Sequence, residues 1–361
     1  MVYEDRITTV RNKIEELGLD AILFTNLINI RYLCGYSGSN GLLFVSKKAS
    51  LFLTDFRYKT QIETEVKAAE GIVPEDGLLL DALVARPETT GIYKLGFESS
   101  IAFDRLESMK RCFPETIQWT LVENFVAQMR CIKTSEEVEK VKKAIVVAET
   151  GLRESLDYLR PGITEMEFAA ELEYRMRKHG AEKPAFDTIV VSGERSALIH
   201  GIASPKVIAH GDLVTIDYGA KVDGYHSDIT RTFIMGEPSP KQREIYELVY
   251  LAQTSTVKGV RAGLPGKEID GIARKIIEDA GYGEYFGHGL GHGLGMEVHD
   301  NLGVGSKSEN IIPKGAIITV EPGVYIPGIG GVRIEDDVLV EETGASVLTT
   351  LPKDIDNAII E

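Results

Sequence analysis

The sequence predicts an α+β protein of two domains, in which the second domain carries a pseudo-twofold repeat. The chain has 361 residues, which is long for a single hydrophobic core, so two domains are the default expectation. Residues 1–128 contain several short apolar runs that are typical of β-strands, and none of the seven histidines lies in this part of the chain. In residues 129–361 the order helix, helix, hairpin occurs twice. We therefore expect a smaller α/β domain first and the chemistry in the second domain.

The first domain is predicted to begin with an amphipathic helix. Ile7, Val10, Ile14 and Leu17 recur at helical spacing and share one face, and Gly18 ends the pattern. Short apolar runs that are typical of strands follow at residues 21–24, 42–45, 51–54, 94–97 and 119–122. None of these segments carries a cluster of catalytic side-chain types.

The second domain is predicted to open with two helices, each begun by a capping box. Thr134 with Glu137 begins the first helix, and Thr164 with Glu167 begins the second after a break at Pro161. The segments of the repeat are, in order, a helix to about 159, a helix to about 180, a strand at 188–191, a hairpin at 213–235, a helix at 240–261, a helix from the break at 263–266 to 281, and a hairpin at 316–340. We expect the two halves to pack as one antiparallel sheet covered by helices.

The first hairpin is predicted to bring Asp217 and Asp228 together. A two-residue turn at 222–223 places the two aspartates directly opposite each other. A turn at 223–224, an Asp-Gly pair and the stronger turn dipeptide, makes them diagonal neighbours on the same face. Either turn leaves both carboxylates within reach of one cation.

The second hairpin is predicted to do the same for Glu321 and Glu335. The midpoint between them is Gly328, inside the loop 327–331, so the two glutamates face each other. Two hairpins with two acids each, related by a pseudo-twofold axis, build a cage of four carboxylates. The alternative is that each pair is a solvated strand edge. The matching positions of the two pairs, flanked by apolar strand residues, favour the cage.

The four carboxylates and one imidazole, that of His292, suit two divalent cations better than one. Four carboxylates carry a charge of −4, which two divalent cations neutralise. Without the cations the acids would repel one another and raise each other's pKa. With the cations in place, a shared hydroxide becomes accessible at neutral pH.

The segment FGHGLGHGLGMEVHD carries three histidines, His288, His292 and His299. Its glycines argue against the helical HExxH pattern of zinc proteases and would let the backbone approach a substrate closely. Three histidines beside a carboxylate cage indicate a functional segment.

These motifs resemble the M24 family of metallopeptidases, whose catalytic domain has the pita-bread fold. The matching segments are VTIDYGA, HSDITRT, GHGLGHGLG, TVEPGVY and GVRIEDD. The segments RYLCGYSGSNG and LTDFRY are similar to those of the creatinase/aminopeptidase P N-terminal domain. The resemblance implies a creatinase-like domain at 1–128 and a pita-bread catalytic domain at 129–361.

The resemblance also implies a role for each candidate ligand. Asp217 would bind one cation, His292 and Glu321 would bind the other, and Asp228 and Glu335 would bridge the two. This ligand set suits Mn²⁺, with Co²⁺ or Zn²⁺ as substitutes. Glu321 would also carry a proton from water to the leaving proline nitrogen.

Five further residues are assigned by the resemblance to the substrate side of the site. His200 and His299 would steady the peptide carbonyl and its oxyanion. His288 would line the pocket for proline. Tyr325 and Arg333 would orient carboxylates or substrate.

The implied activity is that of an Xaa-Pro aminopeptidase acting on peptides with proline at the second position, and LTDFRY favours this reading. The alternative is an Xaa-Pro dipeptidase, or prolidase, and a remote one is a non-catalytic binding protein on the same scaffold. The resemblance further implies a homodimer.

Composition bears on the remaining partners and on location. The net charge of −15 argues against a nucleic acid or an anionic membrane as a partner. No apolar run of 18 residues is present, so no spanning helix is expected. The N-terminus lacks the apolar region of a secretory signal, and the three cysteines lack metal-site spacing. These features predict a cytoplasmic protein.

Overall fold

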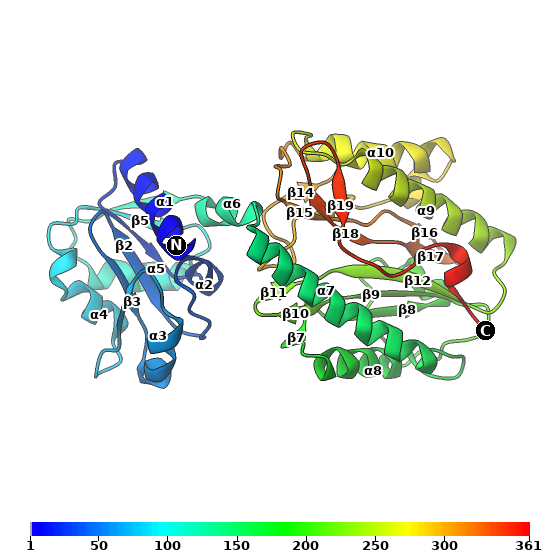
Figure 1. The fold of residues 1–361 in the computed structure, drawn as a ribbon, viewed down its shortest axis with the longest axis horizontal. Coiled ribbons are helices and arrows are strands. Elements are labelled where there is room, and N and C mark those ends of the chain that lie inside the picture. The colour runs from blue at the N-terminus through cyan, green and yellow to red at the C-terminus, as the bar shows by residue number, and fades with distance from the viewer. Residues whose placement is uncertain (1) are drawn as a thin grey trace. The chain divides into compact units, whose positions relative to one another are not determined.

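The computed structural model describes residues 2–361, and the chain divides into two compact units (Figure 1). The N-terminal unit ends at Met129, and the C-terminal unit runs from Arg130 to Glu361. The chain passes from one to the other within helix α6 (Phe125–Cys131). The α+β fold class predicted from the sequence is confirmed.

The N-terminal unit is a mixed six-stranded sheet in the order β4-β3-β2-β1-β5-β6. Its strands are β1 (Ala21–Phe24), β2 (Leu42–Ser46), β3 (Ser50–Leu53), β4 (Glu70–Ile72), β5 (Lys94–Glu98) and β6 (Gln118–Val122). Its other helices are α1 (Val2–Glu16), α2 (Leu27–Cys34), α3 (Lys59–Glu65), α4 (Leu79–Val84) and α5 (Phe103–Cys112). The predicted helix and all five predicted strands are present.

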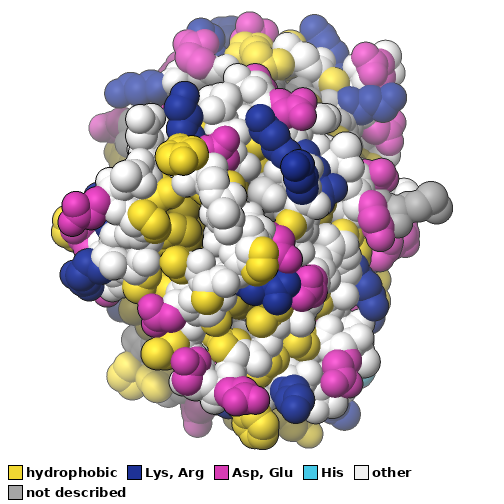
Figure 2. Space-filling model, turned by 90° about the vertical axis from the view of Figure 1, so that its left-hand side faces the viewer, with side chains coloured by type: hydrophobic (Ala, Val, Ile, Leu, Met, Phe, Trp, Pro, Cys, Tyr) yellow, Lys and Arg dark blue, Asp and Glu magenta, His cyan; other side chains and the backbone are white. Residues whose placement is uncertain are grey.

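One face of this unit mixes hydrophobic, acidic and basic side chains. In Figure 2, which faces the left-hand side of Figure 1, acidic and basic side chains are interspersed with hydrophobic ones. Neither sign of charge dominates that face.

The C-terminal unit begins its long helices with the predicted capping boxes. The Thr134 hydroxyl accepts the Glu137 N–H while the Glu137 carboxylate accepts the Thr134 N–H, and Thr164 with Glu167 repeats the arrangement. A third capping box, at Ser239, was not predicted. Each such cap stabilises its helix by about 1 kcal/mol. The helices are α7 (Ser135–Ser155), α8 (Glu165–Lys178), α9 (Pro240–Gly259) and α10 (Gly266–Asp279).

The strands of the C-terminal unit lie between two helix pairs, α7 with α8 and α9 with α10 (Figure 1). The first half contributes β7 (Lys183–Pro184), β8 (Ile189–Ser192), β9 (Leu213–Tyr218), β10 (Ala220–Val222), β11 (Tyr225–His226) and β12 (Ile229–Met235). The second half contributes β13 (Gly291–His292), β14 (Gly303–Val304), β15 (Ile317–Val320), β16 (Gly323–Ile326), β17 (Gly330–Arg333), β18 (Asp336–Val340), β19 (Ala345–Val347) and β20 (Ile359–Ile360). Buried side chains of α9, α10 and both hairpins form a continuous hydrophobic core.

The prediction of one antiparallel sheet is wrong, because the two hairpins belong to separate hydrogen-bonded sheets. One sheet has the order β20-β12-β9-β8, while β15-β18-β19 and β16-β17 form two others. Between them, the Thr215 hydroxyl donates to the Gly331 carbonyl (3.2 Å) and the Thr232 hydroxyl donates to the Arg333 carbonyl (3.0 Å). Side-chain hydroxyls thus satisfy carbonyls that a continuous ladder would have used.

The first hairpin turns at Asp223 and Gly224, which both have positive φ angles, of 51° and 81°. Two successive residues of this kind make a type I′ turn, whose twist matches that of the strands. The resulting register places Asp217 opposite Thr230, so Asp228 is its diagonal neighbour. Of the two turns considered from the sequence, the structure has the Asp-Gly turn.

The second hairpin keeps one register across the break between β15 and β16. Val320 pairs with Asp336 at the end of one ladder, and the next ladder continues in the same register. Glu321 and Glu335 occupy the break and face each other, as predicted. Outside a regular ladder, their backbones leave the carboxylates free to turn inward.

Among residues 2–361, no helix combines the length and the apolar character that crossing a bilayer requires.

Candidate active site

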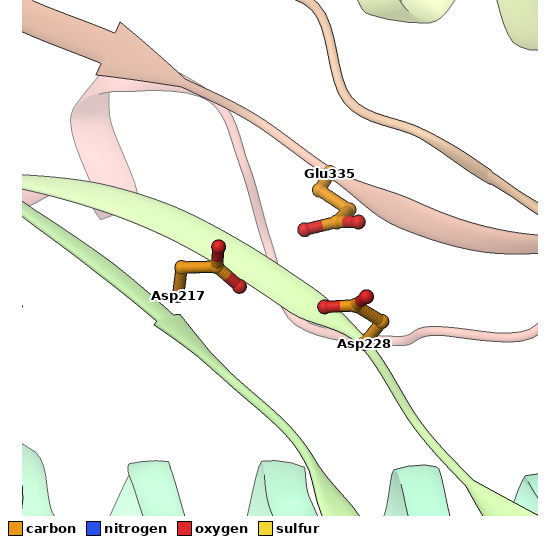
Figure 3. Close-up of side chains that lie close together, drawn as sticks. All are labelled: Asp217, Asp228 and Glu335. Atoms are coloured by element: carbon orange, nitrogen blue, oxygen red, sulfur yellow. The ribbon is translucent and has the colours of Figure 1, made fainter. Parts of the chain in front are cut away.

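Three of the predicted ligands form a compact acidic cluster. Oxygens of Asp217, Asp228 and Glu335 all lie within 4.8 Å of one another. Figure 3 shows the three carboxylates turned toward one another. Asp217 is in β9, Asp228 immediately precedes β12, and Glu335 immediately precedes β18. The relative exposures of Asp228 and Glu335 are only 5% and 1%.

The other two predicted ligands lie against this cluster. The His292 Nε2 atom is 3.5 Å from Asp228 Oδ2 and 3.4 Å from Glu321 Oε1. Thr319 links the pair, because its hydroxyl accepts the His292 N–H (3.1 Å) and donates to Glu321 Oε1 (3.1 Å). The structure therefore brings all five predicted ligands together.

Two buried carboxylate oxygens of the cluster, Asp217 Oδ1 and Glu335 Oε1, have no hydrogen-bond partner among residues 2–361. Each carboxylate is fixed through its other oxygen. Arg333 donates to Asp217 Oδ2 (2.7 Å), and the Thr230 hydroxyl donates to Glu335 Oε2 (2.6 Å). Buried polar atoms are almost always satisfied, so these oxygens are the positions that a cation would fill. Together with one imidazole, the donor set fits hard divalent cations such as Mn²⁺.

The electrostatics of the cluster favour protons in the absence of cations. Burial, and then the negative charge of neighbouring acids, raises the pKa of Asp228 and of Glu335 well above their usual range. Burial also raises the pKa of Glu321 to about 8, against the opposing charge of Arg333. In contrast, burial lowers the pKa of His292 to about 4, which leaves its imidazole neutral and able to ligate at neutral pH.

These shifts predict that stabilisation by metal grows with pH. Glu321 has a pKa of 4.5 in the unfolded chain and about 8 in the folded metal-free site, so the folded state holds the extra proton between those values. Stability from that proton is complete below the lower value and is lost as pH rises through the upper one. Bound cations take the place of this proton, so the metal-loaded protein does not lose this stability as the pH rises. We expect the increase in Tm caused by Mn²⁺ to be larger near pH 8 than near pH 5.

The measurement compares chelated and reloaded protein at each pH. Both forms share one unfolded state, so groups outside the cluster cancel in the difference between them. An increase in Tm that is equal at both pH values would contradict the assignment.

On the substrate side, a chain of hydrogen bonds runs from His288 to the cluster. Tyr325 OH lies 3.0 Å from His288 Nε2 and accepts from Arg333 Nη1 (2.9 Å). Arg333 in turn holds Asp217, as described above. Burial raises the pKa of Tyr325 to about 12, so its hydroxyl keeps its proton and donates it to His288 Nε2.

This chain defines the protonation state of His288. Its Nδ1 lies 2.7 Å from the carbonyl of Gly289, which can only accept, so Nδ1 carries the proton and Nε2 accepts. Burial lowers the pKa of His288 to about 4, in keeping with a neutral ring.

The two remaining predicted histidines are exposed at the edge of the site. The His299 ring stacks at a tilt on the His292 ring, with centroids 4.0 Å apart. His200 lies close enough to His288 for its charge to lower the pKa of that residue. Both side chains are accessible to a substrate.

Sequence reasoning missed three residues that hydrogen-bond to the predicted ligands. Thr319 and Thr230 donate to Glu321 and Glu335, and Asp337 accepts the Asp228 N–H through Oδ2 (3.1 Å). The available signal was positional. Thr319 lies two residues before a ligand on the same strand face, and Thr230 follows another ligand at the same spacing.

Comparisons with known proteins identify the family and its two domains. Residues 139–342 match the model of metallopeptidase family M24, and residues 6–132 match that of the creatinase/prolidase N-terminal domain. The structure of an Xaa-Pro dipeptidase from Bacillus anthracis is 43% identical, with a TM-score of 0.95 over 99% of this chain and 100% of that chain. The structure of an X-Pro aminopeptidase from Thermotoga maritima MSB8 is 38% identical, with a TM-score of 0.89 over 98% and 99% of the two chains. An Xaa-Pro dipeptidase of Pyrococcus horikoshii is 39% identical over 98% of this chain and 99% of its own.

Proposed function

The chain belongs to metallopeptidase family M24, as its motifs predicted, and we propose that it hydrolyses the peptide bond of Xaa-Pro dipeptides. The observation that carries the proposal is the convergence of five metal donors around two unpartnered carboxylate oxygens. Similar proteins named Xaa-Pro dipeptidase favour the dipeptide over the longer peptides that we expected from the sequence. The full donor set also argues against a non-catalytic binding protein.

Asp217, Asp228, His292, Glu321 and Glu335 would hold two divalent cations, and we propose Mn²⁺. When bound, such a pair supplies Lewis acidity that polarises a carbonyl and lowers the pKa of water to near neutrality. The Lewis acidity of the metal pair matters for an Xaa-Pro bond in particular. The proline nitrogen of that bond carries no hydrogen and the proline ring constrains the backbone, so the bond fits ordinary peptidase sites poorly.

Glu321 is proposed to move the proton that the reaction requires. Water adds its oxygen to the carbonyl carbon before proline, the carbon–nitrogen bond breaks, and the water proton ends on the proline nitrogen. Glu321 Oε1 lies beside His292 and is held by Thr319, so one carboxylate can accept this proton and then donate it. General acid–base transfer of this kind contributes about 10²- to 10⁴-fold in rate.

The histidines are proposed to bind the substrate around that bond. His200 and His299 are exposed and can donate hydrogen bonds to the peptide carbonyl and to the oxyanion that develops on it. His288, which is held by Tyr325, is proposed to contact the proline side with its neutral ring. Arg333 is occupied by Asp217, Thr230 and Tyr325, so we propose that it orients the site and does not bind the substrate.

A second candidate function is removal of the N-terminal residue from longer Xaa-Pro peptides. The similarity to the X-Pro aminopeptidase structure from Thermotoga maritima MSB8 favours it, since identity and coverage nearly match those of the dipeptidases. The two functions differ in whether the site accepts residues beyond proline.

The deciding experiment compares kcat/KM for an Xaa-Pro dipeptide with that for an Xaa-Pro-Yaa-Zaa tetrapeptide of the same first residue. We expect the dipeptide to be preferred by at least about 10-fold, which corresponds to about 1.4 kcal/mol. A Gly-Gly dipeptide serves as the control for proline selectivity. Clear preference for the tetrapeptide would overturn the dipeptidase assignment and support the second candidate.

A further inference from the structure

We infer that three fully buried carboxylates are positioning residues, each of which holds a loop that carries one substrate-side histidine. The inference rests on the proposed function, because it concerns how those histidines are placed. The carboxylates are Glu165, Asp270 and Asp300, and the corresponding loops carry His200, His288 and His299. Each carboxylate is paired with an arginine.

Glu165 closes the loop that carries His200. It is the first residue of α8, and its Oε1 accepts the N–H (2.7 Å) and the hydroxyl (2.9 Å) of Ser192. Its Oε2 accepts the N–H (3.1 Å) and the hydroxyl (2.7 Å) of Ser204. Arg195, which lies inside the loop, pairs with Glu165 through its Nε atom, 3.2 Å from Glu165 Oε2. One carboxylate therefore joins both ends of the segment around His200.

Asp270 holds the loop that carries His288. Its Oδ1 accepts the Leu290 N–H (3.1 Å), and both of its oxygens accept from Arg274 (2.7 and 2.9 Å). The same arginine donates to the carbonyls of Phe286 (3.0 Å) and His288 (2.8 Å). The backbone is thus held before, at and after His288.

Asp300 holds the loop that carries His299, its direct neighbour in sequence. Its Oδ1 accepts from Arg130 Nη2 (2.7 Å), and Lys133 Nζ lies 3.5 Å from its Oδ2. Arg130 also pairs with Glu297, so the loop is anchored on both sides of His299. The positive charges of Arg130 and Lys133 therefore balance the negative charges of Asp300 and Glu297.

The three carboxylates share the same depth of burial and the same kind of partners. Each carboxylate has a relative exposure of 0%, a burial that a charge tolerates only when it is paired and hydrogen-bonded. Within residues 2–361, the side-chain hydrogen bonds and ion pairs of these carboxylates go to the loops and to the paired arginine and lysine side chains. None of them reaches the five predicted ligands. Glu165 and Asp270 also occupy the second helix of each half of the pseudo-twofold repeat.

The test is a set of double-mutant cycles with the variants Glu165→Gln, Asp270→Asn and Asp300→Asn. Each is combined with the variants His200→Ala, His288→Ala and His299→Ala in turn. We expect each carboxylate variant to lower kcat/KM on the Xaa-Pro dipeptide by at least about 10-fold, because misplacement of a catalytic group by about 1 Å costs up to about 10²-fold. Bound metal should stay at the wild-type amount.

The cycles separate positioning from general damage to the fold. The effect of a carboxylate variant should vanish when its own histidine is already alanine, and should persist when either of the other two histidines is alanine. The mismatched pairs are therefore matched controls. Arg130→Lys and Arg274→Lys keep the positive charge but lose one of the two N–H donors that each arginine directs at its carboxylate. They give milder versions if an acid variant fails to fold.

Hydrogen exchange in the metal-free protein supplies a readout that does not depend on activity. Each carboxylate variant should speed backbone exchange in its own loop, 192–204, 286–290 or 295–301, and not in the other two. The inference would be overturned, and the proposed function left standing, if the effects were additive in every background and if exchange changed in all three loops or in none. Full activity of a His→Ala variant would instead refute the proposed role of that histidine, and with it the positioning role of the carboxylate that holds its loop.

Discussion

The Glu335→Gln variant is expected to lose hydrolysis by more than about 100-fold, beyond the 10- to 100-fold typical of residues that only support a ligand. Glutamine keeps the size of the side chain and a partner for the Thr230 hydroxyl, but it removes the charge on the oxygen that no protein group satisfies. We expect bound metal to fall below two ions per chain. Because burial and the neighbouring acids already raise the pKa of Glu335 in the metal-free site, a neutral glutamine should leave the metal-free variant no less stable than the wild type.

Asp336→Asn is the matched control, since Asp336 is the next residue and is equally buried. Its carboxylate points away from the cluster and pairs with Arg231 (2.8 Å) and Lys353. Breaking such a buried ion pair costs about 3–5 kcal/mol. We therefore expect a large loss of stability with the metal content unchanged. Equal metal content in both variants would contradict the assignment of Glu335 as a ligand.

The Glu321→Gln variant is expected to fold, to retain metal in part, and to lower kcat by about 10²- to 10⁴-fold with little change in KM. Glutamine keeps an oxygen that can face the cation and accept from Thr319, but it cannot accept and return a proton. The measurement is steady-state kinetics on an Xaa-Pro dipeptide at saturating Mn²⁺, with metal content determined in parallel. Glu309→Gln, at an exposed glutamate that pairs with Lys267, is the control for a surface change of the same kind.

A second substrate sharpens the assignment of Glu321. An ester analogue has a leaving group that departs without protonation, so the loss caused by Glu321→Gln should be smaller for the ester than for the peptide. An equal loss on both substrates would show that Glu321 acts only as a ligand.

Much of the site could be predicted from the sequence because its determinants are local. The capping boxes at Thr134 and Thr164 need only four residues each, and the Asp-Gly turn sets the register that brings Asp228 beside Asp217. The symmetric loop around Gly328 likewise implied that Glu321 faces Glu335. In each case a backbone preference and a count of residues are sufficient.

The features that were missed depend on contacts between distant segments. The hairpins were expected to share one sheet, but the hydroxyls of Thr215 and Thr232 bond the carbonyls of the other hairpin. Glu165 is a first-turn acid of a helix, and Asp270 stands four residues before Arg274, both of which are ordinary helical features. Their bonds to loops some 20 to 40 residues away follow from tertiary packing, which periodicity does not encode.

The substrate preference was also beyond the reach of the sequence alone. The LTDFRY segment favoured the aminopeptidase, while the named relatives favour the dipeptidase. The chemistry at the bond is the same in both, so the ligands and histidines do not distinguish them. The difference lies in the space available beyond proline.

The most direct test of the central claim is hydrolysis of an Xaa-Pro dipeptide by the chelated protein before and after addition of Mn²⁺, with bound metal counted in the same samples. The account predicts no turnover in the chelated protein, and full turnover when two ions are bound per chain. Turnover without metal, or two bound ions without cleavage of the Xaa-Pro bond, would contradict it.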